Sequence, residues 1–448
     1  MNDLPSDLLL SVLKRATDRG ATAADGFLTD ERRFSAVVRL GEVDTVSHAR
    51  DQRLALRVFV GRASAAASTS DLSPESLERL AGEAIGLAHV TAEDPWAGLA
   101  DAAELIDRVP DLDLRDAGGH DLLPEAKIAI ARRAEAAALG ADPRITNSEG
   151  AECWDRQARY AYATSAGFAA AYATSSFGLS VSPVATRNGE MQRDSWYSMA
   201  RQRSRLEDPE AVGRAAAARA LRRLGARKVR TAEVPVVFDP ETAASLVRAL
   251  AAAASGPSLY RRASFLCDRL GTRTAAPGVT VVDDGLLPAG LGSRPFDGEG
   301  LATRRTVVLH EGVLTSYLLD SYSGRKLGLA STHHAARDGS GVTVGTTNLM
   351  LLPGPATPED LIGSVRNGFY VTELIGFGVN GVTGDYSRGA VGLWIENGRL
   401  AYPVEEVTIA GNLLEMLTAI DGVGNDLVLR DRAASPTIRV ARMVVAGN

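Results

Sequence analysis

A near-repeat in the middle of the chain constrains its fold more than any other sequence feature. The sequence Tyr-Ala-Thr-Ser occurs at residues 162–165 and again at 172–175, with Gly167 between the two copies. Two copies are too few for a solenoid, in which each stacked unit needs neighbours. The short spacing and the glycine are typical of two adjacent antiparallel strands. The surrounding segment, residues 145–199, is therefore predicted to be rich in antiparallel strands.

The chain before this segment mixes helical and strand-like patterns. An amphipathic helix begins at Ser6, and a second helix begins where Ser73 can cap it, with proline at the first helical position. Between these helices, residues 34–43 and 54–68 are predicted to form two strands, because apolar side chains alternate in the second of them.

Residues 94–110 are acidic, rich in alanine and interrupted by prolines, so they are predicted to form a linker. Helices are predicted on both sides of the central strand-rich segment, at residues 123–139 and 209–224, and a basic connector follows at 225–231.

The last part of the chain begins with a clear strand-to-helix junction. Residues 234–238 are predicted to form a strand, Asp239 caps the following helix, and that helix extends to about residue 255. Beyond it hairpins dominate, with predicted turns at residues 310–312 and 396–398; Asn397-Gly398 supplies the positive φ angles of a tight hairpin.

These patterns predict an α+β protein in which an N-terminal α/β domain is followed by a larger C-terminal domain rich in antiparallel β-hairpins. The expected boundaries are residues 1–93 for the N-terminal domain, 110–225 for a central segment of helix and antiparallel strands, and 232–448 for the C-terminal domain.

Composition excludes several classes of partner. The 448 residues include 49 Lys and Arg against 55 Asp and Glu, and only 5% are aromatic. A net charge of −6 with so few aromatic side chains gives no basis for binding nucleic acid or an anionic membrane, and no apolar run approaches the ~18 residues of a membrane helix. The two cysteines, Cys153 and Cys267, match no metal or redox spacing, which favours a reducing, cytoplasmic location.

Some short motifs match those of catalytic or cofactor-binding sites, but the sequence around each motif does not predict the structure that such a site needs. Residues 376–381 match GxGxxG, but a loop is predicted after them instead of the helix that a dinucleotide site needs. His333 and His334 are adjacent, so their side chains diverge, and a loop pair with surface or interface contacts is the expected role. The acidic pair Asp283-Asp284 is expected at the surface. The residues alone therefore predict no catalytic and no metal-binding site.

The densest polar stretch extends from Asn380 to Gly389. Its turn-forming residues surround one tyrosine and one arginine, a composition that suits either the wall of a cleft or an elaborate turn before the next strand. Both interpretations stay open. The candidate cleft or structural residues are Asn380, Asp385, Tyr386, Ser387, Arg388 and Gly389.

Several longer motifs resemble the TldE (PmbA) branch of the TldD/PmbA family, in order and over essentially the whole chain. They are NSEG at 147–150, SFLCD at 264–268, YSGRKLG at 322–328, GDYSRGA at 384–390, WIENG at 394–398, YPV at 402–404, IAGN at 409–412 and VGND at 423–426.

The resemblance implies a subunit without a metal site of its own. In the TldD branch, a helix carrying HExxxH and a cysteine near the C-terminus bind zinc. The matching helix here, residues 241–255, has no His and no Glu after Glu241. HExxxH occurs nowhere in the chain, and no cysteine follows Asp426. No cofactor is therefore expected on this chain, and zinc is expected in a TldD-like partner.

The function implied is that of the non-catalytic half of a heterodimeric protease for unfolded or flexible peptides, of the kind associated with microcin maturation and antitoxin turnover. The residue 385–389 segment would help to hold an extended substrate. Two alternatives stay open: a stand-alone homodimer that binds peptides without cutting them, and an independent hydrolase with an unrecognised site.

Overall fold

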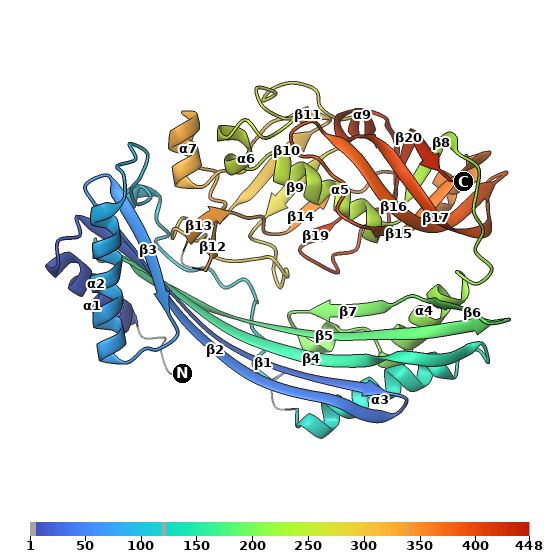
Figure 1. Cartoon of the computed structure of the whole chain (residues 1–448), viewed down its shortest axis with the longest axis horizontal. Helices are drawn as coiled ribbons and strands as arrows, with labels where there is room; N and C mark the ends of the chain where they lie inside the picture. The colour runs from blue at the N-terminus through green and yellow to red at the C-terminus, as the bar shows by residue number, and fades with distance from the viewer. Residues whose placement is uncertain (1–5, 119–121, 340, 448) are drawn as a thin grey trace.

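A computed structural model describes residues 6–118, 122–339 and 341–447. The ends of the expected domains at residues 1–5 and 448 lie outside this description. A long, curved sheet carries helices on its outer side, and a compact C-terminal half lies over its concave side (Figure 1). The sheets are mixed with helices and are mostly antiparallel, so the expected α+β class and the hairpin-rich C-terminal half are confirmed.

The long sheet combines strands from the first two expected segments. Its order is β3-β2-β1-β4-β5-β6, and β7 pairs with β5. The near-repeat lies on the adjacent antiparallel strands β4 and β5, as predicted, with Tyr160 opposite Tyr172. The strands are β1 (Ala23–Arg39), β2 (Glu42–Val60), β3 (Ala63–Thr69), β4 (Ile145–Thr164), β5 (Ala169–Arg187), β6 (Glu190–Arg193) and β7 (Trp196–Ala200).

The two strands predicted at 34–43 and 54–68 have wrong boundaries. Each predicted run contains a turn, at Leu40-Gly41 and at Gly61, where φ is positive (51°, 81° and 61°). Glycine allows this conformation, so the chain reverses inside each apolar run. The result is three strands instead of two, and β1 begins well before the predicted start.

Four helices cover the outer face of the long sheet: α1 (Ser6–Asp18), α2 (Pro74–Val90), α3 (Pro124–Leu139) and α4 (Pro209–Leu221). The first two pack on one end of the sheet and the last two on the other, in two separate apolar clusters. Ser73 caps α2 as predicted, and its hydroxyl accepts from the Ser76 amide. Helices α3 and α4 approach each other closely at Gly213, where an added Cβ would lie 2.1 Å from the Ala134 carbonyl oxygen.

The predicted linker at residues 94–110 is mostly irregular, with one short 3-10 turn, η1 (Ala102–Glu104). It is nevertheless fixed to the C-terminal half. The Arg325 guanidinium donates to the carbonyl oxygens of Trp96, Gly98 and Leu99, at 2.8 to 3.0 Å, and the Tyr322 hydroxyl donates to Asp94 at 2.7 Å.

The C-terminal half packs helix α5 (Pro240–Ala253) against two sheets. The first sheet, of order β17-β16-β15-β8-β20-β18, consists of β8 (Ala232–Phe238), β15 (Asn367–Ile375), β16 (Asp385–Glu396), β17 (Arg399–Asn412), β18 (Ile420–Val423) and β20 (Ile438–Ala446). The second, of order β11-β10-β9-β14-β19, consists of β9 (Val281–Asp284), β10 (Arg305–His310), β11 (Val313–Leu314), β14 (Leu349–Leu351) and β19 (Ala433–Ala434).

Smaller elements complete this half: the hairpin β12 (Ala335–Asp338) and β13 (Gly341–Val344), with helices α6 (Gly256–Tyr260), α7 (Ser321–Leu327), α8 (Pro358–Gly363) and α9 (Leu413–Thr418). The Asp239 cap and the turns at 310–312 and 396–398 are confirmed. In the described part of the chain, no helix combines the length and apolar content that crossing a membrane requires.

Candidate functional site

The two faces of the long sheet have opposite chemistry because side chains alternate along each strand. On β1, Leu28 points toward α1 and α2, whereas Phe27, Thr29, Glu31 and Arg33 point toward the C-terminal half. The same alternation on β2, β4 and β5 leaves an apolar face under the helices and a polar face opposite. The polar face is the one available to a ligand.

A cleft of about 740 Å³ lies between this polar face and the C-terminal half. Tyr160 and Tyr172 lie on the sheet side with ring centroids 5.0 Å apart. The loop at residues 291–294 and strand β12 form the opposite side. The charged lining residues are Glu31, Arg33, Asp51, Arg53, Arg156, Arg201, Arg294, Arg337 and Arg432.

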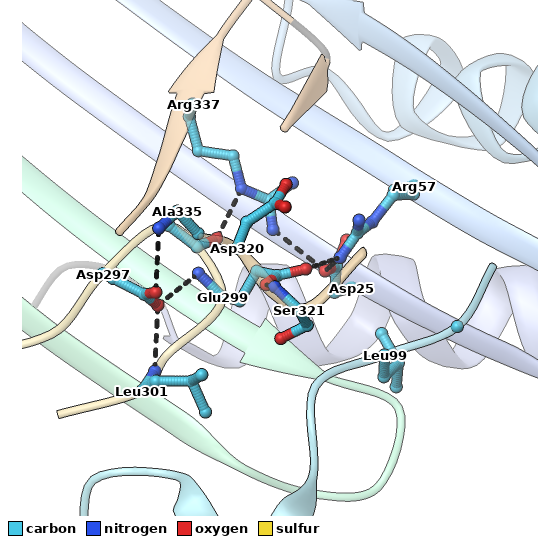
Figure 2. Close-up of polar contacts among 12 residues, drawn as sticks. Asp25, Arg57, Leu99, Asp297, Glu299, Leu301, Asp320, Ser321, Ala335 and Arg337 are labelled. Atoms are coloured by element: carbon cyan, nitrogen blue, oxygen red, sulfur yellow. Dashed lines mark hydrogen bonds and ion pairs between the residues drawn. The ribbon is translucent and has the colours of Figure 1, made fainter. Parts of the chain in front are cut away.

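A buried ionic cluster joins the sheet to the C-terminal half, and it shares Arg337 with the lining of the cleft (Figure 2). Asp25 of β1 accepts from Arg57 Nε at 3.2 Å, from Arg337 Nη2 at 2.9 Å and from the Tyr162 hydroxyl at 3.1 Å. Arg57 also reaches Glu299 at 3.3 Å. Burial alone would raise the pKa of Asp25, but the charges of Arg337 and Arg57 lower it to about 2.

The loop that carries Glu299 is fixed by Asp297, which lies beneath it. The Asp297 carboxylate accepts from the backbone amides of Glu299, Leu301 and Ala335 at 2.8 to 3.1 Å, and Glu299 in turn accepts from the Ser321 amide at 2.9 Å (Figure 2). Both acids are buried. The carboxylates of Asp297 and Glu299 are therefore engaged within the protein and do not line the cleft.

Asp297 gives the fold a testable pH dependence. Burial, and then the negative charge of Glu299, raise the pKa of Asp297 from 3.8 to about 7. The folded protein therefore retains a proton that the unfolded chain loses, so this contribution to stability is complete below about pH 4 and is lost as the pH rises to about 7. We expect Asp297→Asn, which keeps an acceptor oxygen but does not titrate, to flatten the stability profile over this range in urea unfolding. Parallel profiles for the two proteins would show that another group titrates.

Helix α5 is where the family resemblance places zinc ligands, and its residues do not fit that metal. Its only titratable side chains are Glu241 and Arg248. Glu241 accepts from the Tyr197 hydroxyl at 2.9 Å, and Arg248 pairs with Asp431 at 2.9 Å. A catalytic zinc site needs three nitrogen, sulfur or oxygen ligands. No group of three His, Cys, Asp or Glu suited to a metal occurs among the described residues.

The adjacent histidines and the Asp283-Asp284 pair do not lie where the sequence suggested. His334 is buried and hydrogen bonds Asp283 at 3.0 Å through Nε2 and Thr332 at 2.9 Å through Nδ1, and His333 Nδ1 lies 2.7 Å from the Ala302 carbonyl oxygen. The surface position predicted for His334, Asp283 and Asp284 is therefore wrong, whereas His333 is half-buried. The loop before β12 folds onto β9, and a hydrogen-bonded His–Asp contact allows both groups to be buried.

The six candidate residues of the 380–389 stretch lie away from the cleft. Asn380 closes a turn in which its side chain accepts from the Val382 amide at 3.0 Å. The loop predicted at 385–389 is wrong, because these residues begin strand β16 and pair with β17. Tyr386 is buried in the C-terminal core, Arg388 is half-buried and donates to the Leu374 carbonyl oxygen at 3.3 Å, and Gly389 pairs with Ile375 and Thr408. Asp385 and Ser387 are exposed.

Sequence reasoning missed the cleft because its lining comes from many separate parts of the chain, between Phe27 and Arg432. A signal was present: on β4, polar and aromatic residues alternate with Ala151, Cys153 and other residues of the helix-facing side. That alternation indicates a sheet with one apolar and one polar face, but it does not show which part of the chain packs over the polar face.

Three family models match the chain in order. They are PmbA/TldA metallopeptidase domain 1 at residues 24–88, the central domain at 119–224 and the C-terminal domain at 231–447.

Relatives and solved structures match over nearly the same length. Metalloprotease PmbA of Escherichia coli O157:H7 is 40% identical over 92% of this chain and 90% of its own, and the Haemophilus influenzae homologue is 37% identical over 97% and 94%. A solved structure from Bacteroides thetaiotaomicron has a TM-score of 0.91, with 28% identity over 99% and 98% of the two chains. TldE from Thermococcus kodakarensis has a TM-score of 0.87 over 98% and 100%, with 19% identity, and shares the fold.

Proposed function

This chain belongs to the PmbA/TldD metallopeptidase family, and we propose that it is the subunit of a paired peptidase that does not carry the zinc site. The observation that carries this proposal is helix α5, whose polar groups are engaged within the chain and include no histidine. In this proposal a TldD-like partner supplies HExxxH, the zinc ion and the hydroxide that attacks the peptide bond. The chain itself contributes binding surface.

A free strand edge supports the proposal of a partner. Strand β3 pairs with β2 only from Leu54 to Val60, so the edge of β2 from Glu42 to Gln52 has no neighbouring strand within the described chain. Residues 42–51 are exposed, including Val43 and Val46 (41% and 50%). Open edges of this length are usually covered in native proteins. A second subunit would cover this one.

The substrate role rests on the cleft. We propose that unfolded or flexible peptides are held there in extended form, since its polar walls can hydrogen bond a peptide backbone and its aromatic rings can pack against side chains. Asp385 and Ser387, exposed on β16, would contact a substrate or partner at the boundary between the subunits. The two free cysteines agree with the cytoplasmic location that we propose.

Native mass spectrometry of the tagged protein purified from its own host tests the pairing. We expect a one-to-one complex with a chain that bears HExxxH, with one zinc ion per pair, and cleavage of an unfolded peptide by the pair but not by this chain alone. A metal-free homodimer that captures peptides without cutting them would replace this proposal with a binding protein. Cleavage by the isolated chain that survives chelators would instead establish an independent hydrolase.

A further inference from the structure

The cleft has a charge opposite to that of the whole protein. The chain carries a net charge of −6, yet seven arginines line the cleft against only two acids, Glu31 and Asp51. Glu31 is already engaged by Arg33 and Arg156. The low-dielectric walls of a cleft focus the electric field of the charges that line it. The cleft therefore attracts anions even though the molecule as a whole is acidic.

Arg201 contributes a positive charge that no carboxylate of the described residues pairs with. Its side chain is 5% exposed and donates only to carbonyl oxygens: those of Ser175 at 3.1 Å, Gly290 at 3.2 Å and Leu291 at 2.6 Å. Burial, and then the nearby charge of Arg432, lower the pKa of Arg201 to about 10. A buried cation without a carboxylate is costly, and a bound anion would offset that cost.

Several donor groups around the cleft also lack acceptors. Arg156 Nε, Arg294 Nε and Arg337 Nη1 are buried and find no hydrogen-bond partner among the described residues. Two further lining residues, Arg53 and Arg432, are exposed and form no ion pair with a described residue. Guanidinium groups with free donors are the usual protein ligands of carboxylates, which they bind in a two-pronged geometry.

We propose that the cleft binds an acidic segment of an extended polypeptide, whose Asp and Glu carboxylates pair with Arg53, Arg432 and Arg294 while its backbone lies along Tyr160 and Tyr172. This proposal rests on the proposed function and specifies the chemistry of the substrate that the subunit selects. A peptide fits better than a nucleic acid, because Asp51 can accept a hydrogen bond from a backbone amide, which a nucleic-acid backbone lacks. The net charge of −6 also opposes a long polyanion more than a short acidic segment.

Fluorescence anisotropy on the purified full-length chain tests this preference directly. The probes are a fluorescein-labelled flexible peptide with a central run of glutamates and a matched peptide with glutamines at the same positions. We expect the glutamate peptide to bind at least about tenfold more tightly, because hydrogen bonds to charged groups are the stronger ones. This advantage should shrink as salt is raised from about 50 mM to about 500 mM.

Point variants locate the site. Arg53 and Arg432 form no ion pair with another described residue, so their loss should not disturb the fold. Arg53→Gln and Arg432→Gln should each weaken binding of the glutamate peptide about three- to tenfold, and should weaken binding of the glutamine peptide by a smaller factor. The matched control is Arg214→Gln on α4, exposed on the helix-covered side of the sheet, which should change neither affinity.

The outcomes separate this proposal from the pairing proposal, because binding is measured without any protease. Equal affinity for the two peptides, equal losses in the cleft variants and the Arg214 control, or tighter binding of a single-stranded oligonucleotide of the same charge would each overturn the acidic-segment proposal. The pairing with an HExxxH chain would still be decided by native mass spectrometry.

Discussion

Asp25→Ala should lower the free energy of unfolding by about 3–5 kcal/mol, the usual cost of removing one member of a buried ionic cluster. Asp25 is completely buried and is the shared acceptor of Arg57, Arg337 and Tyr162. Without it, the Arg337 guanidinium has no described carboxylate partner. Urea denaturation followed in parallel by tryptophan fluorescence and circular dichroism measures the loss.

Asp30→Ala is the matched control for this experiment. Asp30 lies on the same strand and also binds an arginine with both oxygens, since Arg50 donates at 3.0 and 3.1 Å. Arg50 is about half exposed, with 48% of its side chain accessible, so this pair should contribute no more than about 1 kcal/mol. Equal losses in the two variants would show that the Asp25 cluster does not hold the two halves together.

The stabilisation by the same cluster depends on pH. Because the folded pKa of Asp25 lies below its ordinary value of 3.8, its ionic stabilisation is present above about pH 4 and is lost as the pH falls toward about 2. The stability difference between the wild type and Asp25→Ala should therefore be constant from about pH 7 to pH 5 and shrink below about pH 4.

Gly213→Ala should destabilise the protein by about 2 kcal/mol, although alanine is the better helix former. The added methyl group would lie 2.1 Å from the Ala134 carbonyl oxygen, so α3 and α4 would have to separate. Overpacking of this kind costs about 1–3 kcal/mol, which exceeds the gain in helix propensity of about 1 kcal/mol.

The control for this variant is the same substitution in α2. Gly86 is exposed, and an added Cβ would meet no atom within 4 Å. Gly86→Ala should therefore stabilise the protein by about 1 kcal/mol, through helix propensity alone. Thermal unfolding of the two variants should show shifts of opposite sign, and a gain in stability for Gly213→Ala would mean that the helices can move apart without cost.

Local signals in the sequence predicted local structure well. The near-repeat at 162–175 identified a pair of antiparallel strands, Asp239 identified a helix start, and Asn397-Gly398 identified a hairpin turn, because each depends on residues close together in the chain. The glycine turns at Gly41 and Gly61 could have been recognised as well. They were missed because the apolar runs on both sides looked continuous.

The burial of charged groups could not be predicted in this way. Asp283, His334 and Asp25 lie in ordinary sequence contexts, and each becomes buried because a partner arrives from a distant segment: Thr347 for Asp283, Asp283 for His334 and Arg337 for Asp25. The cleft has the same origin. The family resemblance covers the whole chain and indicates the class of protein. It does not show which residues from distant segments come into contact.

The position of β1 in the long sheet has a consequence for synthesis on the ribosome. β1 pairs with β2 as soon as β2 is made, but its partners on β4 follow 113 (Val38 to Ala151) to 139 (Asp25 to Thr164) residues later. At about 5–20 residues per second, the N-terminal hairpin waits on the order of 10 s with that edge unpaired. During this interval the nascent chain is a natural client for chaperones, and neighbouring nascent chains on one polysome could pair through it.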